Sequence, residues 1–185
     1  MINYLGRFIP NLSEKTTTLR SLTHTRAVWK WAGEHEREFH DLKKLITEEP
    51  IMKFYDPSLP IKISSDASKS SLGCVLMQKH GEHFYPISYA SREMTSAETQ
   101  YAMIEKELLG IFFAFERFHQ FVYGHGNVEV ETDHKPLIPL FSKNLSNCPL
   151  RIQRLMIRLQ KYDFSIFSCQ VNSYTPQMPY QDAVE

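Results

Sequence analysis

The sequence is poor in cysteine, has no excess of charge of either sign and contains no long hydrophobic run. Its three cysteines, Cys74, Cys148 and Cys169, follow no spacing typical of a zinc site or a disulfide framework. The 21 basic and 21 acidic side chains balance, which excludes a general attraction for polyanions. No run of about 18 apolar residues exists to cross a membrane, and the first residues lack the apolar core of a signal peptide. We therefore expect a soluble, intracellular protein, cytoplasmic or nuclear, without a membrane partner.

The chain divides at a cluster of turn-forming residues. Its 185 residues suffice for one domain and an additional segment. Before the cluster, apolar residues between Gly33 and Thr47 recur at helical spacing, and Ser13 is a candidate helix cap. The cluster itself is Asp56-Pro57-Ser58-Leu59-Pro60. We therefore predict a small helical segment over residues 1–57 and a second domain over residues 58–185.

The second domain shows strand and helix periods in a defined order. Three short strands joined by short turns are predicted at about 61–65, 72–78 and 84–90, which makes them antiparallel neighbours. Apolar residues at three- and four-residue steps then predict a helix over 98–122. A strand ending at Asp133 follows this crossover and should lie parallel to an earlier strand. Helices at 136–141 and 151–161 and a strand at 163–169 complete an α/β fold with a mixed five-stranded sheet flanked by helices.

Carboxylates occur where two of these strands end. In Pro60-Ile-Lys-Ile-Ser-Ser-Asp-Ala-Ser68, alternation places Ile63 on one face and Asp66 on the other, at the strand end. Asp133 ends a later strand in the same way. On the intervening helix, Glu105 and Glu107 lie on opposite borders of the apolar stripe, so only one of them can face the aspartates. Two aspartates and one glutamate on rigid elements are typical of a site for a divalent cation.

These residues lie in motifs that resemble a known family. Ser65-Asp66-Ala67-Ser68, then Tyr101 with Glu105-Lys-Glu-Leu-Leu109, then Thr132-Asp133-His134-Lys135-Pro136-Leu137, resemble the ribonuclease H domain of gypsy-type retrotransposon reverse transcriptases. The resemblance extends from about Ile2 to Ile166. It implies that residues 1–57 are a remnant of the thumb or connection region. The chain lacks the paired aspartates of a polymerase active site.

The resemblance also implies a catalytic site. It selects Glu107 over Glu105, and it makes Asp66, Glu107, Asp133 and a fourth carboxylate ligands of two Mg²⁺ ions, for which Mn²⁺ can substitute. Asp66 would bridge both ions. After Ile166 the chain departs from the family, because the Pro-Gly-Lys turn that precedes the fourth carboxylate is missing. Two interpretations of Asp182 stay open, the displaced fourth ligand or unrelated tail sequence.

Several polar residues are candidates for contact with the substrate. Arg151, Arg154 and Arg158 share one helical face with Lys161 nearby, which fits either a row of phosphate contacts or a solvated basic face. Ser68, Ser70, Ser91, Arg92 and Gln100 lie near strand ends or the helix start. His134 either orients a phosphate or water or makes a local hydrogen bond at a helix start.

The expected function is cleavage of the RNA strand of RNA/DNA hybrids by a two-metal mechanism. The expected partners are the hybrid and the polymerase portion of the same polyprotein. Neutral net charge predicts weak, salt-sensitive binding by this chain alone. The alternative is a catalytically silent module that binds a hybrid or a polymerase partner, which the altered tail motivates.

Overall fold

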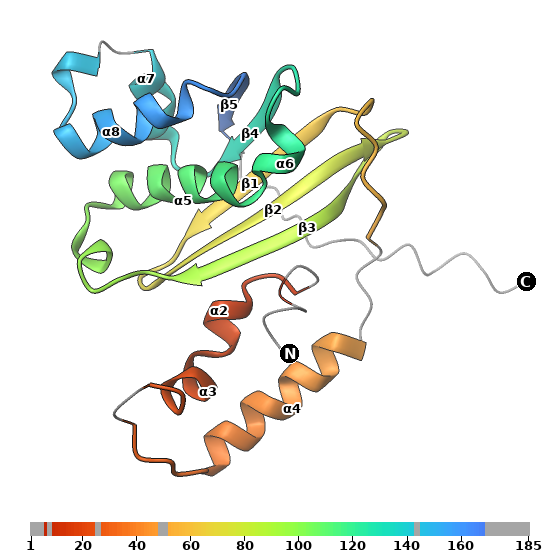
Figure 1. Ribbon diagram of the computed structural model, residues 1–185, viewed down its shortest axis with the longest axis vertical. Coiled ribbons are helices and arrows are strands. Elements are labelled where there is room, and N and C mark those ends of the chain that lie inside the picture. The colour runs from red at the N-terminus through yellow and green to blue at the C-terminus, as the bar shows by residue number, and fades with distance from the viewer. Residues whose placement is uncertain (1–5, 7–8, 25–26, 48–51, 143–144, 169–185) are drawn as a thin grey trace, which may run out of the picture.

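A five-stranded sheet forms the centre of the molecule (Figure 1). The computed structural model describes residues 6, 9–24, 27–47, 52–142 and 145–168. In the order β3-β2-β1-β4-β5, the sheet consists of β1 (Ile61–Ala67), β2 (Ser71–His80), β3 (His83–Glu93), β4 (Val128–Thr132) and β5 (Phe164–Ser168). β1, β2 and β3 are antiparallel neighbours, whereas β4 runs parallel to β1 and β5 parallel to β4. The predicted mixed sheet and the parallel return strand are confirmed.

Helices lie on both sides of this sheet (Figure 1). The α-helices are α2 (Leu12–Lys15), α3 (Thr17–Ser21), α4 (Gly33–Thr47), α5 (Met103–Arg117), α6 (His119–Val122), α7 (Ile138–Phe141) and α8 (Leu150–Leu159). Short 3-10 turns are η2 (Glu98–Gln100), η3 (Lys135–Leu137) and η4 (Leu145–Asn147). No helix in the described part of the chain is both long and apolar enough to span a bilayer.

Two local predictions were wrong. The helix expected over 98–122 is interrupted at Tyr101, whose backbone is extended (φ −69°, ψ 150°), and at Phe118 (φ −98°, ψ 15°). The apolar stripe continues through both breaks, so periodicity alone does not reveal them. Ser13 does not cap a helix, because α2 begins at Leu12 after Asn11 and the Ser13 N–H donates to Ser91 Oγ on β3 at 2.9 Å.

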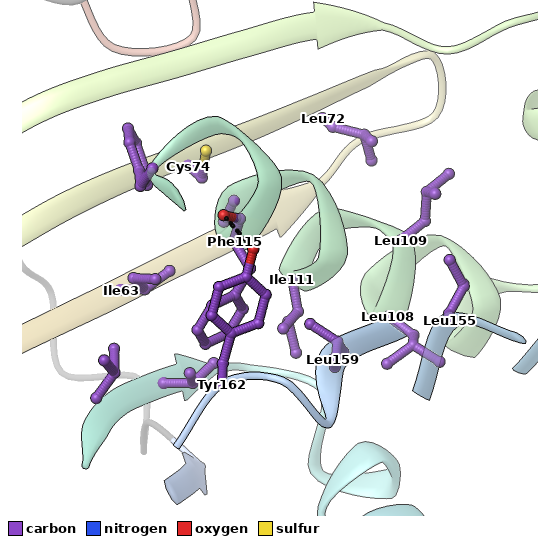
Figure 2. Close-up of a cluster of buried hydrophobic side chains, with 14 of the residues drawn as sticks. Ile63, Leu72, Cys74, Leu108, Leu109, Ile111, Phe115, Leu155, Leu159 and Tyr162 are labelled. Atoms are coloured by element: carbon purple, nitrogen blue, oxygen red, sulfur yellow. Dashed lines mark hydrogen bonds between the residues drawn. The ribbon is translucent and has the colours of Figure 1, made fainter. Parts of the chain in front are cut away.

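The main core lies between β1, β2, α5 and α8 (Figure 2). β1 alternates as predicted, with Ile61, Ile63 and Ser65 buried and Asp66 exposed. Phe115 of α5 is fully buried and packs on Tyr162 with ring centroids 4.7 Å apart. The Tyr162 hydroxyl donates to the Phe115 carbonyl at 3.3 Å. These contacts attach the chain after α8 to the last turn of α5.

The N-terminal segment has a small core of its own. Ile9, Leu12 and Leu42 form it, with Leu19 packed against it. α2 also lies on β3 through the bond from Ser13 to Ser91, so this segment rests against the sheet. The boundary at residue 57 stays a prediction.

Candidate active site

Asp66 and Asp133 lie at the ends of neighbouring parallel strands. Paired residues of β1 and β4 run from Lys62 with Glu129 to Ser64 with Glu131. Continuing this register by two residues places Asp66 level with Asp133. The pairing of β1 with β4 ends before either aspartate, although Asp66 still pairs with Gly73 of β2, and both aspartates lie at the same end of these two strands.

Glu107 reaches this end of the two strands from α5. Gly110, one turn further on, lies against β1, where a β-carbon would be 3.8 Å from Ser65 Oγ and 3.9 Å from the Asp66 carbonyl. This close approach places the first turns of α5 over the end of β1. Glu107 is only 2% exposed, and no described residue donates a hydrogen bond to its carboxylate. A buried carboxylate without a donor is costly unless it is protonated or binds a cation.

Glu105 has a different role. Its Oε2 accepts a hydrogen bond from the Ala102 N–H at 3.1 Å, at the start of α5. Both its oxygens accept from Arg151 Nη1 at 2.9 Å. Because Glu105 is satisfied by these donors and Glu107 is not, the two borders of the helix are chemically distinct.

The three predicted carboxylates influence one another electrostatically. Burial, followed by repulsion from Asp133 and Asp66, raises the pKa of Glu107 to about 8. Partial burial and the Asp133 charge likewise raise the pKa of Asp66. Carboxylates whose pKa values are raised by burial and by a neighbouring like charge are typical of functional sites, including those that bind a cation.

The arrangement is not a closed metal cage. Among the residues that the structure describes, no group of three or more His, Cys, Asp or Glu side chains is placed to hold a metal ion. A cation would therefore have to draw the three carboxylates closer together. Asp182, the candidate fourth ligand, lies outside the described residues.

Sequence reasoning missed Glu14 of α2. Its charge contributes to the raised pKa of Asp66, although it is a smaller cause than burial and Asp133. Glu14 comes from the N-terminal segment, whose sequence shows no pattern that would direct a carboxylate toward this strand end. The packing of α2 on the sheet brings it there.

Two of the predicted substrate contacts lie near the aspartates in sequence and make local bonds. Ser68 Oγ accepts from the Ser71 N–H at 2.9 Å in the turn between β1 and β2. The His134 N–H donates to Thr132 Oγ1 at 3.2 Å, and its imidazole has no hydrogen bond to a described residue. The local bond expected of His134 involves its backbone.

Arg92 is held by an acidic partner. Its Nη1 and Nη2 each lie 2.8 Å from an oxygen of Glu98, and these hydrogen bonds are the main reason that the pKa of Glu98 falls to about 2. This bidentate pair fixes the direction of the Arg92 guanidinium.

Most of the predicted basic row attaches α8 to α5. Arg151 pairs with Glu105 and lies 3.9 Å from the Tyr101 ring centroid. Arg158 lies 4.3 Å from the Phe112 ring centroid, and Glu116 pairs with both Arg158 and Lys161. Arg154 is exposed and pairs with no described residue. Packing therefore explains much of the pattern, and contact of Arg151 and Arg154 with substrate stays a prediction.

The Arg151–Glu105 pair is expected to stabilise the fold. Replacing Arg151 with alanine should lower the free energy of unfolding by about 1–2 kcal/mol, because an ion pair and a ring contact are both lost. A double-mutant cycle with Glu105→Ala, measured by urea denaturation, should return a coupling energy of about 1 kcal/mol. Arg154→Ala on the same helix is the matched control and should have almost no effect. Equal destabilisation by Arg151→Ala and Arg154→Ala would contradict this account.

The strand order, the crossover by α5 and the acidic edge together define a ribonuclease H-like fold. Residues 31–130 match the family described as "RNase H-like domain found in reverse transcriptase". The chain is also 33% identical over 164 residues to a retrovirus-related Pol polyprotein of transposon 412 from Drosophila melanogaster. It is 30% identical over 169 residues to the transposon Tf2-3 polyprotein of Schizosaccharomyces pombe. The chain therefore belongs to the family of ribonuclease H-like domains of reverse transcriptases.

These relatives are much longer than this chain. Each match covers 89% of this chain but only 13% of the Drosophila and 12% of the Schizosaccharomyces polyprotein. Among solved structures, a foamy viral protease-reverse transcriptase in complex with an RNA/DNA hybrid has a TM-score of 0.72 and 21% identity, over 97% of this chain and 25% of that one. The same viral protein in complex with double-stranded DNA has a TM-score of 0.73 and 22% identity, over 93% of this chain and 37% of that one. At these identities the structures show the fold alone.

Proposed function

We propose that this chain is the ribonuclease H domain of a retrotransposon reverse transcriptase and that it cleaves the RNA strand of RNA/DNA hybrids. The proposal is supported by one observation above all. Carboxylates of β1, α5 and the end of β4 interact at one end of the central strands, where burial, followed by repulsion from Asp133 and Asp66, raises the pKa of Glu107 to about 8. In this proposal, residues 1–57 are a thumb or connection remnant and residues 58–185 the nuclease domain.

The donor set suits magnesium. Carboxylate oxygens on rigid elements are hard ligands of the kind Mg²⁺ prefers. When bound, two Mg²⁺ ions would activate water and stabilise the leaving oxygen during displacement at phosphorus, and Mn²⁺ would substitute. Asp66 would hold both ions, and Glu107 and Asp133 would hold the one of the two that is nearer to them. Asp182 is proposed as the fourth ligand.

Glu107 has a particular part in this scheme. Near neutral pH it holds a proton in the absence of metal, because its pKa is about 8. It must release that proton to become a ligand, so metal binding should strengthen as pH rises. Asp133 lies level with Asp66 and approaches the same space from the neighbouring strand.

The proposed substrate is recognised by polar groups around this end of the strands. Ser68, Arg92, His134, Arg151 and Arg154 are the proposed contacts. A hybrid differs from duplex DNA by its 2′-hydroxyls and groove shape, which polar side chains and backbone can read without a high net charge. We propose that the polymerase portion of the same polyprotein, acting inside the cell, holds most of the hybrid.

The second candidate function is that of a catalytically inactive module that binds a hybrid. It is favoured by the finding that the described carboxylates do not form a closed metal cage. Both candidates predict binding of a hybrid, and only the first predicts its cleavage.

Cleavage of a labelled hybrid separates the two candidates. The purified chain should shorten the RNA strand of a hybrid with a labelled RNA 5′ end in Mg²⁺ or Mn²⁺ and should not cut in EDTA. Double-stranded DNA and single-stranded RNA of the same sequence are the controls. Hybrid binding without cleavage at high protein concentration would support the silent module instead.

A further inference from the structure

A groove of about 290 Å³ opens at the edge strand β3. Its walls come from three regions that are distant in the sequence. The lining residues that carry the argument are Arg20 from α3, Tyr89, Ser91 and Arg92 from β3, and Phe113 and Arg117 from α5. The groove therefore exists only when the N-terminal segment rests against the sheet.

The groove is positively charged. Three arginines line it, and no carboxylate is among its lining residues. Glu98 neutralises the charge of Arg92 alone, through an ion pair. Arg20 Nε donates to the neutral Thr16 hydroxyl at 2.8 Å, and Arg117 has no ion pair or hydrogen bond with a residue that the structure describes. Two guanidinium charges thus remain uncompensated within the described residues.

Neutral donors and rings complete the lining. Burial raises the pKa of the Tyr89 phenol, which therefore keeps its proton. Ser91 Oγ accepts the Ser13 N–H, so its own proton is free to be donated. The Phe113 ring supports Arg92, whose guanidinium carbon lies 5.4 Å from the ring centroid. Guanidinium groups with hydroxyl donors match the oxygens of a phosphate, and they do so better than isolated lysines.

The groove lies level with Asp66. The sheet register pairs Asp66 with Gly73 on β2, and Gly73 with Ser91 on β3. Residues directly opposite in a sheet share one face, so Asp66 and Ser91 point the same way. Two strand spacings separate them by about 10 Å. Asn11 lies over Gly73 on this face, between Asp66 and Ser91, so a strand of nucleic acid bound at Asp66 would reach the groove past α2.

We propose that the groove binds a backbone phosphate of the nucleic acid through Arg20, Arg92 and Arg117. The inference rests on the proposed hybrid substrate, and it adds Arg20 and Arg117, which no sequence motif indicates, to the predicted contact Arg92. It also gives the N-terminal segment a function, because Arg20 reaches the phosphate only through that segment.

The test measures binding without cleavage. Affinity of the full chain for a fluorescein-labelled RNA/DNA hybrid is measured by anisotropy in EDTA over a series of salt concentrations. Arg20→Ala and Arg117→Ala should each weaken binding by about 3–10-fold. Each should also reduce the steepness of the plot of log binding constant against log salt concentration, the salt slope, by about one. Arg117→Lys should keep the slope, because the charge remains. Arg37→Ala, an exposed arginine on α4, is the matched control and should bind like the unmodified chain.

The outcomes separate this inference from the proposed function. Unchanged affinity and salt slope in both alanine variants would overturn the groove as a nucleic-acid contact. If ³¹P NMR shows that inorganic phosphate binds and that Arg117→Ala removes this binding while the hybrid is unaffected, the site takes free phosphate and the inference is also overturned. Weakened hybrid binding by the variants, in a chain that cuts no hybrid, would support the groove and contradict the nuclease.

Discussion

Replacing Asp66 with asparagine is expected to lower the rate of hybrid cleavage by about a thousandfold or more. Asp66 is the carboxylate proposed to hold both metal ions, and an amide at the same place loses the charge while keeping the shape. Metal ions in such sites supply several kcal/mol of transition-state stabilisation, and about 4 kcal/mol corresponds to a thousandfold. Initial rates in Mg²⁺ with a labelled hybrid provide the measurement.

The fold should tolerate this substitution. Asp66 lies near the end of β1, and partial burial together with repulsion from Asp133 raises its pKa, so removing the charge should not destabilise the fold. Circular dichroism should show an unchanged spectrum. Asp41→Asn, an exposed position on α4, is the matched control and should cleave normally. Cleavage by Asp66→Asn at more than a tenth of the normal rate would exclude Asp66 as the bridging ligand.

The metal-free protein is expected to lose stability as pH rises from about 4.5 to about 8. The pKa of Glu107 is 4.5 in its unperturbed state and about 8 in the folded protein. Over this window the folded chain holds a proton that the unfolded chain has released. The stabilisation is complete below about 4.5 and is lost as pH rises through the folded value. Bound Mg²⁺ should reverse the loss, because it pairs with the ionised carboxylate.

Glu107→Gln should remove this dependence. Without metal at pH 8.5, the variant should be more stable than the unmodified chain by about 1–3 kcal/mol, or about 3–8 °C in Tm. Added Mg²⁺ should raise the Tm of the unmodified chain and leave that of Glu107→Gln nearly unchanged. Glu34→Gln, on the exposed start of α4, should behave like the unmodified chain. Parallel pH profiles for the Glu107→Gln variant and the unmodified chain would show that Glu107 does not titrate in this range.

Much of the fold follows from local patterns in the sequence. Period-two alternation around Ile63 identified β1, and the three- and four-residue steps around Leu108 and Phe115 identified the face of α5 that packs on the sheet. Such patterns reflect burial directly, because one face of each element meets the core. The family motifs then indicated which of Glu105 and Glu107 faces the aspartates, a choice that helix geometry alone left open.

Contacts between distant segments could not be predicted in the same way. A row of basic residues on α8 fits phosphate binding as well as packing, and only the positions of Glu105 and Glu116 reveal that much of the row pairs with α5. The groove at β3 joins Arg20 to Arg117 across most of the chain. No local period encodes such long-range proximity, because it depends on how α2 and α3 rest on the sheet.

The proposed magnesium site can be located directly by anomalous diffraction from crystals soaked in Mn²⁺. The account predicts two peaks about 3.5–4 Å apart, with a carboxylate oxygen of Asp66 on each and with Glu107 and Asp133 on the nearer one. Density for Asp182 beside the second peak would identify the fourth ligand. Well-ordered crystals with no peak near Asp66, or with Mn²⁺ bound only elsewhere, would contradict a metal-dependent nuclease at this sheet edge.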